Sequence, residues 1–345
     1  MPLAAENSEL GLFEERLAAL ASQSSQSIVS PLRNEVFGEA GSGNVIGAEL
    51  KRLEASSGGL MGLSAIHLQD GRTVSYRDSE SFPMASTFKI ALAMCILQLI
   101  DHEKVALDQM VEISADLLVP PPLIEPYFRH IGLAISVANL LDIMMVTSDN
   151  SATDALLKLV GGPDYVSQAI AKANIAGMRI DRSTSQFLAD FLEIDLTEGQ
   201  SFASFFSVLP AREKARLYAL TEQANNNYDD DERDNASPAA MAKLLAKLWH
   251  GNLTSIASRD RLFEVMERCE NDNRIKGCMP AHVTIAHKTG TLGGSTSDVG
   301  VIELPEKSGS VAIAIYIKKS ASPVIIRERA IAHASRAVYD FMLMT

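Results

Sequence analysis

Hydrophobic and polar positions follow strand patterns at both ends of the chain. The segments "GLMGLSAIHL" (59–68) and "RTVSYR" (72–77) are separated by "QDG", which predicts a β-hairpin. Apolar residues dominate again over residues 283–290, 297–304 and 310–318, each of a length typical of a strand. Because strands occur at both ends, we expect the two ends of the chain to contribute to one sheet.

Between these strands the apolar positions repeat at helical spacing, from Ser86 to about residue 270. One example is "SPAAMAKLLAKLWHG", in which Ser237 is a plausible N-cap, Pro238 takes the first helical position and Gly251 ends the helix. Helices are also predicted for residues 46–56 and for the final segment "IRERAIAHASRAVYDFMLM". The pattern therefore predicts an α/β (α+β) fold.

We expect this fold to be divided as follows. Residues 1–45 form an N-terminal appendage or linker, and residues 46–80 and 275–345 form the sheet domain. Residues 81–274 form a helical domain inserted into the sheet domain, with a long loop insertion at about 183–236. The functional site is expected between the two domains.

Composition and charge narrow the range of partners. The chain has 345 residues, 47% of them hydrophobic, and a formal net charge of −12, which argues against nucleic acid and anionic membrane surfaces as partners. No apolar run reaches the length needed to span a bilayer. The first residues, "MPLAAENSELGLFEERL", lack the pattern of an export signal. The compartment stays open: periplasmic or secreted if a signal was removed, otherwise cytoplasmic.

Cysteine and histidine usage offers no sign of a cofactor. Cys95 has the surroundings of a helix-core residue, whereas Cys269 and Cys278 flank a probable turn. We expect two free thiols there, with a disulfide as the alternative under oxidising conditions. The seven histidines form no spaced cluster, so we predict no metal site and no cofactor.

The stretch "FPMASTFKIALAM" (82–94) places Ser86 three residues before Lys89, where a polar stretch becomes apolar. On a helix, positions three apart face the same way, so the hydroxyl and the amine can meet. A desolvated lysine has a lowered pKa and can act as a base toward the serine. The pattern indicates an activated nucleophile, although this spacing alone also occurs by chance.

A second polar cluster, Ser148-Asp149-Asn150, lies between two predicted helices. A short loop can direct Ser148 and Asn150 toward one cleft, where Ser148 could relay a proton and Asn150 could hold a substrate amide. The alternative is that Asp149 or Ser151 only caps the following helix.

The third cluster, Lys288-Thr289-Gly290-Thr291, lies on a predicted strand. Gly290 permits close approach of a ligand to the backbone, and the lysine and hydroxyl groups could bind a carboxylate. The backbone N–H of Thr291 could stabilise an oxyanion together with that of Ser86.

The three clusters occur in the order S-x-x-K, S-D-N and K-T-G, which together are typical of class A β-lactamases and penicillin-binding proteins. The chain resembles a class A β-lactamase, most clearly in "FPMASTFK", "RIKGCMPAHVTIAHKTG" and "STSDVGVIELP". The resemblance covers about residues 47–182 and 235–345. It implies a serine β-lactamase/transpeptidase-like fold, in which helices flank an antiparallel sheet and a helical domain is inserted.

The resemblance also implies a role for each matching residue. Ser86 would be the acylated nucleophile, Lys89 its proton partner, and Ser148 the donor of a proton to the leaving nitrogen. Asn150, Lys288 and Thr289 would bind substrate along Gly290, and the amides of Ser86 and Thr291 would form the oxyanion hole. Arg274 stands where some relatives carry a carboxylate-binding arginine; the alternative is a surface arginine.

The chain departs from the family pattern at the step that releases the acyl group. Thr184 occupies the position of the glutamate that activates water in relatives, and Leu188 that of a nearby asparagine. Threonine has no useful pKa for a general base. Asp154 also replaces an asparagine that braces this region in relatives. We therefore expect acylation to proceed and deacylation to be altered.

The insertion at about 183–236 replaces the usual short loop at the floor of the cleft. Its candidate substitute bases are Asp190, Glu193, Asp195 and Glu198. The acidic run at 229–234 is expected to be a solvated loop.

These observations support three hypotheses of function. The first is a serine hydrolase that opens β-lactams through an acyl-enzyme, with deacylation catalysed by the insertion or by Lys89. The second is a related acyl-serine peptidase, esterase or amidase that acts on D-peptide-like or other substrates. The third is a β-lactam-binding or sensing protein that stays acylated. In each case we expect a monomer with a small-molecule ligand and no membrane span.

Overall fold

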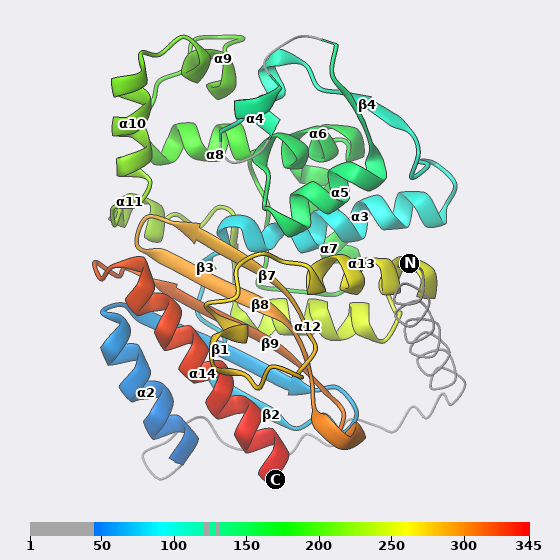
Figure 1. Ribbon diagram of the computed structural model, residues 1–345, viewed down its shortest axis with the longest axis vertical. Helices are drawn as coiled ribbons and strands as arrows, with labels where there is room; N and C mark the ends of the chain where they lie inside the picture. Colours follow the sequence, from blue (N-terminus) through cyan, green and yellow to red (C-terminus); the bar gives the residue numbers. More distant parts are fainter. Residues whose placement is uncertain (1–44, 121–123, 129–131) are drawn as a thin grey trace, which may run out of the picture. The chain divides into compact units, whose positions relative to one another are not determined.

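A five-stranded antiparallel sheet connects the two ends of the described chain (Figure 1). The structure is a computed structural model that describes residues 45–120, 124–128 and 132–345. The appendage predicted for residues 1–45 falls outside these residues, apart from Val45, which begins the first described helix.

The strands lie in the order β2-β1-β9-β8-β7, so the first and last thirds of the chain meet at the centre of the sheet. Every neighbouring pair is antiparallel. The strands are β1 (Leu60–His67), β2 (Thr73–Tyr76), β7 (Ile285–Leu292), β8 (Ser295–Glu303) and β9 (Ser310–Lys318). The predicted hairpin and the three predicted C-terminal strands are thereby confirmed, and so is the α/β fold.

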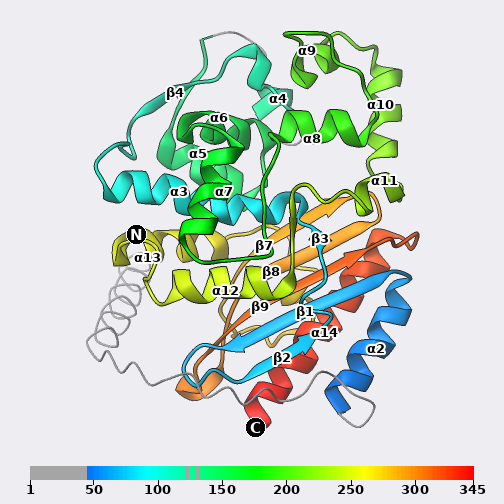
Figure 2. The same ribbon diagram turned by 180° about the vertical axis from the view of Figure 1, so that it is seen from behind.

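Both faces of the sheet are covered by helices, because alternate residues of the central strand β9 are apolar on both sides. Ile313 and Ile315 pack into the core shared with α2 (Val45–Ser57) and α14 (Val324–Met344). Ala314 and Tyr316 pack into the core on the other side, with α12 (Pro238–Trp249). Figure 1 shows α2 and α14 side by side across one face, and Figure 2 shows α12 across the opposite face.

The helical part is built around α3 (Lys89–Asp101), whose first nine residues are all buried. These residues belong to a large apolar cluster that also includes buried residues of α5, α6 and α13. The other elements of this part are β3 (Phe82–Pro83), η1 (Ala85–Phe88), β4 (Met110–Glu112), η2 (Ala115–Leu117), α4 (Ile124–Tyr127), β5 (Ala134–Ser136), α5 (Val137–Val146), α6 (Asn150–Val160), α7 (Pro163–Lys172), β6 (Asn235–Ala236), α13 (Ile256–Glu267) and η3 (Ile275–Cys278).

The division into a sheet domain and a helical domain stays a prediction. Helix α12 lies within the range assigned to the helical domain, yet it packs against β1, β8 and β9 of the sheet.

Cys95, Cys269 and Cys278 are free, so the expected free thiols at 269 and 278 are confirmed. Over the described ranges, the structure contains no helix with the length and apolar character required to cross a membrane.

The insertion is folded and has an apolar core of its own. It contains α8 (Thr184–Phe191), α9 (Phe202–Ser207), α10 (Ala211–Leu220) and α11 (Asn226–Asp229). These helices bury Phe191, Phe202, Phe206 and Leu217 against one another. In both views the segment from α10 to α11 runs toward the end of the sheet at which β7 and β8 are joined (Figures 1 and 2).

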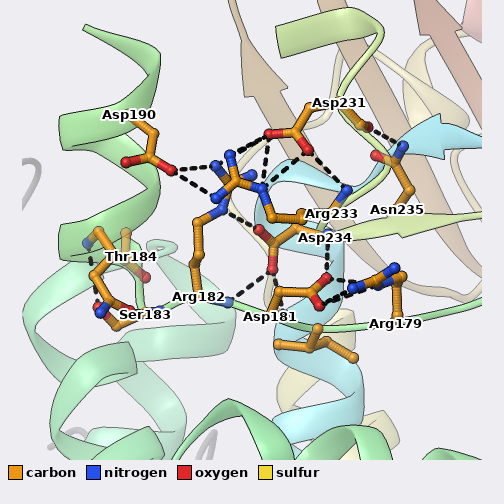
Figure 3. A network of polar contacts seen from close by, with 12 residues as sticks. Arg179, Asp181, Arg182, Ser183, Thr184, Asp190, Asp231, Arg233, Asp234 and Asn235 are labelled. Atoms are coloured by element: carbon orange, nitrogen blue, oxygen red, sulfur yellow. Dashed lines mark hydrogen bonds and ion pairs between the residues drawn. The ribbon is translucent and has the colours of Figure 1, made fainter. Parts of the chain in front are cut away.

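A cluster of ion pairs holds the two ends of the insertion together (Figure 3). The guanidinium of Arg182, before α8, is 2.6 Å from Asp234 Oδ2, 2.7 Å from Asp190 Oδ2 and 3.2 Å from Asp231 Oδ2. Asp234 Oδ1 also accepts hydrogen bonds from the backbone N–H groups of Asp181 and Arg182. We call this cluster the neck, and it closes the insertion into a loop with fixed ends.

The neck and its neighbours correct one expectation. The acidic run 229–234 is not simply a solvated loop, because Asp229 and Asp234 are buried. Asp229 accepts hydrogen bonds from Ser295 Oγ (2.7 Å) and Lys319 N (3.1 Å), which attach α11 to the sheet. Burial is tolerated here because each carboxylate has hydrogen-bond partners.

Replacement of Arg182 should loosen the insertion. We expect Arg182→Met to lower the free energy of unfolding by roughly 3–5 kcal/mol, because it leaves the buried Asp234 carboxylate without its cation. It should also expose residues 184–230 to limited proteolysis. The matched control is Arg216→Met, which removes an exposed ion pair with Glu213 in the same insertion. Equal stability and protease resistance of the two variants would show that the neck does not hold the insertion.

Candidate active site

A cavity of about 330 Å³ brings together most of the residues singled out in the sequence. Its walls come from η1, the loop before α6, the segment before η3, strand β7 and the insertion. The lining residues are Ser86, Pro120, Thr147, Ser148, Asn150, Leu188, Leu192, Phe202, Phe206, Leu217, Tyr218, Thr221, Glu222, Asn271, Arg274, Thr289, Gly290, Thr291 and Leu292. Lys89 and Lys288 are buried beside these residues.

Ser86 lies on the short helix η1, directly against strand β7. A Cβ atom at Gly290 would be 2.6 Å from the carbonyl oxygen of Met84 and 3.1 Å from the backbone nitrogen of Ser86. Only glycine allows this approach, since real Cβ atoms essentially never come within 3.0 Å of a backbone oxygen. Thr87 fixes η1 by donating a hydrogen bond to the Met84 carbonyl (2.8 Å).

Lys89 is fully buried at the start of α3, and its amine points to the Ser148–Asn150 loop. The Nζ atom donates to the Ser148 carbonyl (2.8 Å), to Ser148 Oγ (3.2 Å) and to Asn150 Oδ1 (3.1 Å). Burial, together with the positive charge of Lys288, holds the pKa of Lys89 well below its ordinary value. A neutral amine that contacts a serine hydroxyl can accept and pass on a proton.

The Ser148–Asn150 loop serves the cavity and the fold at once. Asp149 is the N-cap of α6, where its Oδ1 accepts the Ala152 N–H (2.7 Å), so the predicted capping role is confirmed. Ser148 adopts φ 62°, a left-handed conformation that costs energy in a residue other than glycine. This turn directs Ser148 and Asn150 into the cavity, on either side of the capping aspartate.

Strand β7 carries Thr289, Gly290 and Thr291 along one wall of the cavity. Lys288 is fully buried, and its Nζ donates to the Thr289 carbonyl (3.1 Å). Burial lowers the pKa of Lys288 to about 8, against the opposing effect of Cys269 and Asp298. Strand β7 therefore places Thr289 and Thr291 on the wall of the cavity, with the buried amine of Lys288 next to them.

Arg274 is buried and lines the cavity, so the alternative of a surface arginine is wrong. Its guanidinium donates to Thr291 Oγ1 (2.5 Å), to the carbonyl oxygens of Gly290 (2.9 Å) and Ser297 (2.8 Å), and to Glu328 Oε1 (3.2 Å). These contacts fix the arginine against β7, where it can attract an anionic group of a ligand.

Thr184 begins α8 and contributes to docking that helix. Both oxygens of Asp154 accept backbone hydrogen bonds there, from Thr184 (2.7 Å) and Ser185 (2.9 Å). A carboxylate at a helix N-terminus satisfies free N–H groups and the helix dipole. Asp154 therefore braces the insertion, and Thr184 begins a helix.

None of the four acids proposed as substitute bases is among the described residues that line the cavity. Asp190 is paired with Arg182 and Arg233 in the neck, and Glu193, Asp195 and Glu198 are exposed. The structure therefore does not support these candidates.

Glu222 is the acidic residue that does line the cavity, and sequence reasoning missed it. It follows α10, and the backbone N–H of Gly293 donates to the carbonyl of the preceding Thr221 (2.8 Å). This bond attaches the segment to the turn after β7. The sequence offers no signal for such a pairing, because Glu222 belongs to no recognisable motif. Among the described residues, no group of three or more His, Cys, Asp or Glu could hold a metal ion.

Comparison with known proteins gives a consistent result. A model of the β-lactamase enzyme family matches residues 46–342. β-Lactamase AST-1 of Nocardia asteroides is 30% identical over 84% of this chain and 81% of its own length. The carbapenem-hydrolysing β-lactamase KPC of Klebsiella oxytoca is 27% identical over 86% of this chain and 89% of its own length.

Solved structures agree. A β-lactamase from Chitinophaga pinensis superimposes with a TM-score of 0.70 and 27% identity, over 86% of this chain and 99% of its own. An ancestral (GNCA) class A β-lactamase superimposes with a TM-score of 0.70 and 29% identity, also over 86% and 99%.

The burial of Lys288 predicts a pH dependence of stability. The pKa of Lys288 falls from its ordinary value of about 10.4 to about 8 in the folded protein, so the unfolded chain binds the proton more tightly. Below about pH 8 the lysine is charged in both states and its desolvation cost is fully present; above about pH 10.4 it is neutral in both. The stability of the protein relative to Lys288→Met should therefore increase between these pH values.

The free energy of unfolding of the protein and of Lys288→Met is measured by denaturant unfolding from about pH 7.5 to about pH 10. This range covers most of the interval between the two pKa values of Lys288. The control is Lys243→Met, at an exposed position on α12. A stability difference that stays constant over this range would mean that Lys288 is not desolvated.

Proposed function

The chain belongs to the β-lactamase enzyme family, and we propose on this basis that it hydrolyses β-lactams through an acyl-enzyme on Ser86. The observation that carries the proposal is the shared cavity, in which Ser86, Ser148, Asn150, Thr289 and Thr291 meet next to the buried Lys89. The reaction is the cleavage of a cyclic amide C–N bond. We also propose that the protein acts as a monomer.

Acylation needs a base, and we assign this role to Lys89, which follows Ser86 by three residues and contacts Ser148. The neutral amine takes the proton of Ser86 Oγ as that oxygen forms a bond to the carbonyl carbon of the lactam. Ser148, 3.2 Å from Lys89 Nζ, passes a proton to the lactam nitrogen as the C–N bond breaks. Burial lowers the pKa of Lys89, which favours this relay.

The negative charge that develops on the lactam oxygen also needs a partner. Strand β7 lies at the edge of the described sheet, so some of its backbone N–H groups have no neighbouring strand to which they can donate a hydrogen bond. We assign the backbone amides of Ser86 and Thr291 to the oxyanion, because Gly290 brings η1 and β7 so close together. Asn150 holds the amide side chain of the substrate, and Lys288, Thr289 and Arg274 attract its carboxylate.

Deacylation requires activation of a water molecule, and Thr184 is unable to do this. We assign the step to Glu222, because this exposed residue of the insertion is the acidic residue among the described ones that lines the same cavity as Ser86. Glu222 accepts a proton from water as the water oxygen attacks the ester carbon. As the ester C–O bond breaks, the proton held by Glu222 is delivered to Ser86 Oγ, so that Ser86 regains its hydroxyl group and Glu222 its carboxylate. Lys89 is the competing candidate, since its amine is next to Ser148.

Removal of the nucleophile tests the proposed function. We expect Ser86→Ala to reduce hydrolysis of a chromogenic cephalosporin by at least about 1,000-fold, because no acyl-enzyme can form. Lys89→Ala should slow acylation by roughly 100- to 10,000-fold. Ser183→Ala, at the N-cap of α8, serves as the control. Full activity of Ser86→Ala would overturn the assignment, and inactivity of the unmodified protein would favour a different acyl donor.

The role of Glu222 is tested separately. Glu222→Gln should leave the rate of acylation unchanged and prolong the lifetime of the acyl-enzyme by roughly 100-fold or more, because the water loses its base. Single-turnover kinetics measure both rates. Glu213→Gln, on the exposed side of the same segment, is the matched control. An unchanged lifetime would exclude Glu222 and leave Lys89 as the base.

A further inference from the structure

A buried cluster of three ionisable side chains lies next to Lys288. Its members are Cys269, which follows α13, His287 on β7 and Asp298 on β8. His287 and Asp298 are fully buried and Cys269 is 4% exposed, where the end of α13 packs against β7. None of the three lines the cavity, and the reaction proposed above uses none of them. We call this cluster the thiol network.

The Asp298 carboxylate is the centre of the thiol network. The Nδ1 atom of His287 is 2.9 Å from both of its oxygens, and the backbone N–H of Ile275 donates to Oδ2 (3.0 Å). His287 directly precedes Lys288 on β7, and Ile275 directly follows Arg274. One carboxylate therefore fixes the backbone beside both of the cations that we assign to the carboxylate of the substrate.

The sheet itself leaves room for the His287 side chain. Gly300 is opposite His287 in the register of β7 and β8, and a Cβ atom at Gly300 would be 2.7 Å from both Cα and Cβ of His287. Only glycine allows this approach. Asp298 lies two positions before Gly300, on the same face of β8, so the carboxylate and the imidazole are brought together by the pairing of the two strands.

The thiol network carries charge at neutral pH. Burial lowers the pKa of His287, but Asp298 outweighs this effect and raises that pKa to about 9. Burial raises the pKa of the Cys269 thiol, but the neighbouring His287 and the positive charge of Lys288 bring it down to about 7. The Nε2 atom of His287 makes no hydrogen bond of ordinary geometry with a described residue, so the thiol and the ring pair through charge rather than through a close hydrogen bond.

The negative charges of the thiol network act in turn on Lys288. Burial has the largest effect on the pKa of Lys288 and lowers it, whereas Cys269 and Asp298 oppose this effect. The charged and titratable groups that act on Lys288 or on the thiol network are Lys89, Cys269, Arg274, His287 and Asp298. A thiolate at position 269 therefore raises the pH at which Lys288 loses its proton, and loss of the thiolate lowers that pH.

We propose that Cys269, buried beside the His287–Asp298 pair, is a positioning residue for recognition of the substrate's carboxylate: its thiolate keeps Lys288 protonated and thus able to attract that carboxylate. The inference rests on the proposed function, in which Lys288 binds the carboxylate, and adds to it a residue that acts from outside the cavity. A substrate without an anionic carboxylate should therefore be insensitive to Cys269.

The experiment compares a penicillin with its methyl ester, which has the same rings and side chain but no anionic carboxylate. The second-order rate of acylation of Ser86 is measured for both by rapid mixing and intact-protein mass spectrometry, and the ratio of the two rates reports recognition of the carboxylate. A change in the nucleophile or its base affects both rates and cancels in the ratio. The protein and Cys269→Ser are compared at about pH 6 and about pH 8.5, below and above the pKa of Cys269.

The expected signature depends on pH. At about pH 6 the ratio should be the same in Cys269→Ser and in the unmodified protein, because the thiol is neutral and Lys288 is charged in both. At about pH 8.5 the ratio should be at least about threefold lower in Cys269→Ser, because serine has no charge to oppose the desolvation of Lys288. Cys269→Asp restores a negative charge and should bring the ratio back toward that of the unmodified protein.

Two further variants complete the design. Cys278→Ser is the matched control, because Cys278 is a free, partly exposed thiol that contacts His333 (Sγ to Nδ1 3.8 Å). It should leave the ratio unchanged at both pH values. Cys269→Ala removes the charge without burying a hydroxyl group, and takes the place of Cys269→Ser if that variant does not fold.

The outcomes separate this inference from the proposed function. Equal ratios in Cys269→Ser and the unmodified protein at both pH values would overturn the inference and leave the assignment of Ser86 intact. A ratio that falls equally at both pH values, or that Cys269→Asp fails to restore, would also overturn it, since the effect would then be one of packing. Absence of acylation by both the penicillin and its ester would overturn the proposed function, and the inference with it.

Discussion

The close approach of β7 to η1 at Gly290 is the constraint on which the site depends. It sets the Ser86 backbone nitrogen 3.1 Å from the place that a Cβ would occupy, and so brings a helix start and an edge strand into contact. The same contact fixes the position of Thr291 and, through its hydroxyl, of Arg274. Lys89 and Lys288 are both buried, and burial lowers the pKa of both; the positive charge of Lys288 lowers the pKa of Lys89 further. The chemistry of the site therefore follows from a packing requirement.

The second determinant is the insertion, which has to be both folded and attached. Its own core of phenylalanine and leucine side chains folds it, and the neck and Asp154 attach it. Asp154 fixes where α8 begins. Its two carboxylate oxygens accept hydrogen bonds from the backbone N–H groups of Thr184 and Ser185, the first residues of α8, so Thr184 is held in a helix. The helix whose start Asp154 holds also carries Leu188 and Leu192 to the wall of the cavity.

Local spacing made much of this site predictable. Ser86 and Lys89 are three residues apart on a helix start, and Ser148 and Asn150 flank a capping aspartate, so each pair is positioned by its own backbone. The strands of the sheet were predictable because apolar runs of strand length, such as β9, are buried on both faces. The order of the three motifs, and the family that they resemble, then placed these elements in one fold.

Long-range pairing set the limit of prediction. Glu222 reaches the cavity because the backbone N–H of Gly293 donates a hydrogen bond to the carbonyl of the preceding Thr221. Asp234 is buried because it pairs with Arg182, which lies 52 residues away in the sequence. Phe202 and Phe206 look like any apolar residues of a helix until the structure places them on the wall of the cavity that Ser86 also lines. For the same reason, sequence reasoning named Asp190, Glu193, Asp195 and Glu198 as candidate bases and missed Glu222.

The most direct test of the account is intact-protein mass spectrometry over time after mixing with a penicillin, followed by peptide mapping of the adduct. The account predicts a mass increase equal to the whole penicillin, located on Ser86, that appears and then decays while the drug is consumed. An adduct on any other residue, or drug that stays intact with no adduct, would contradict it.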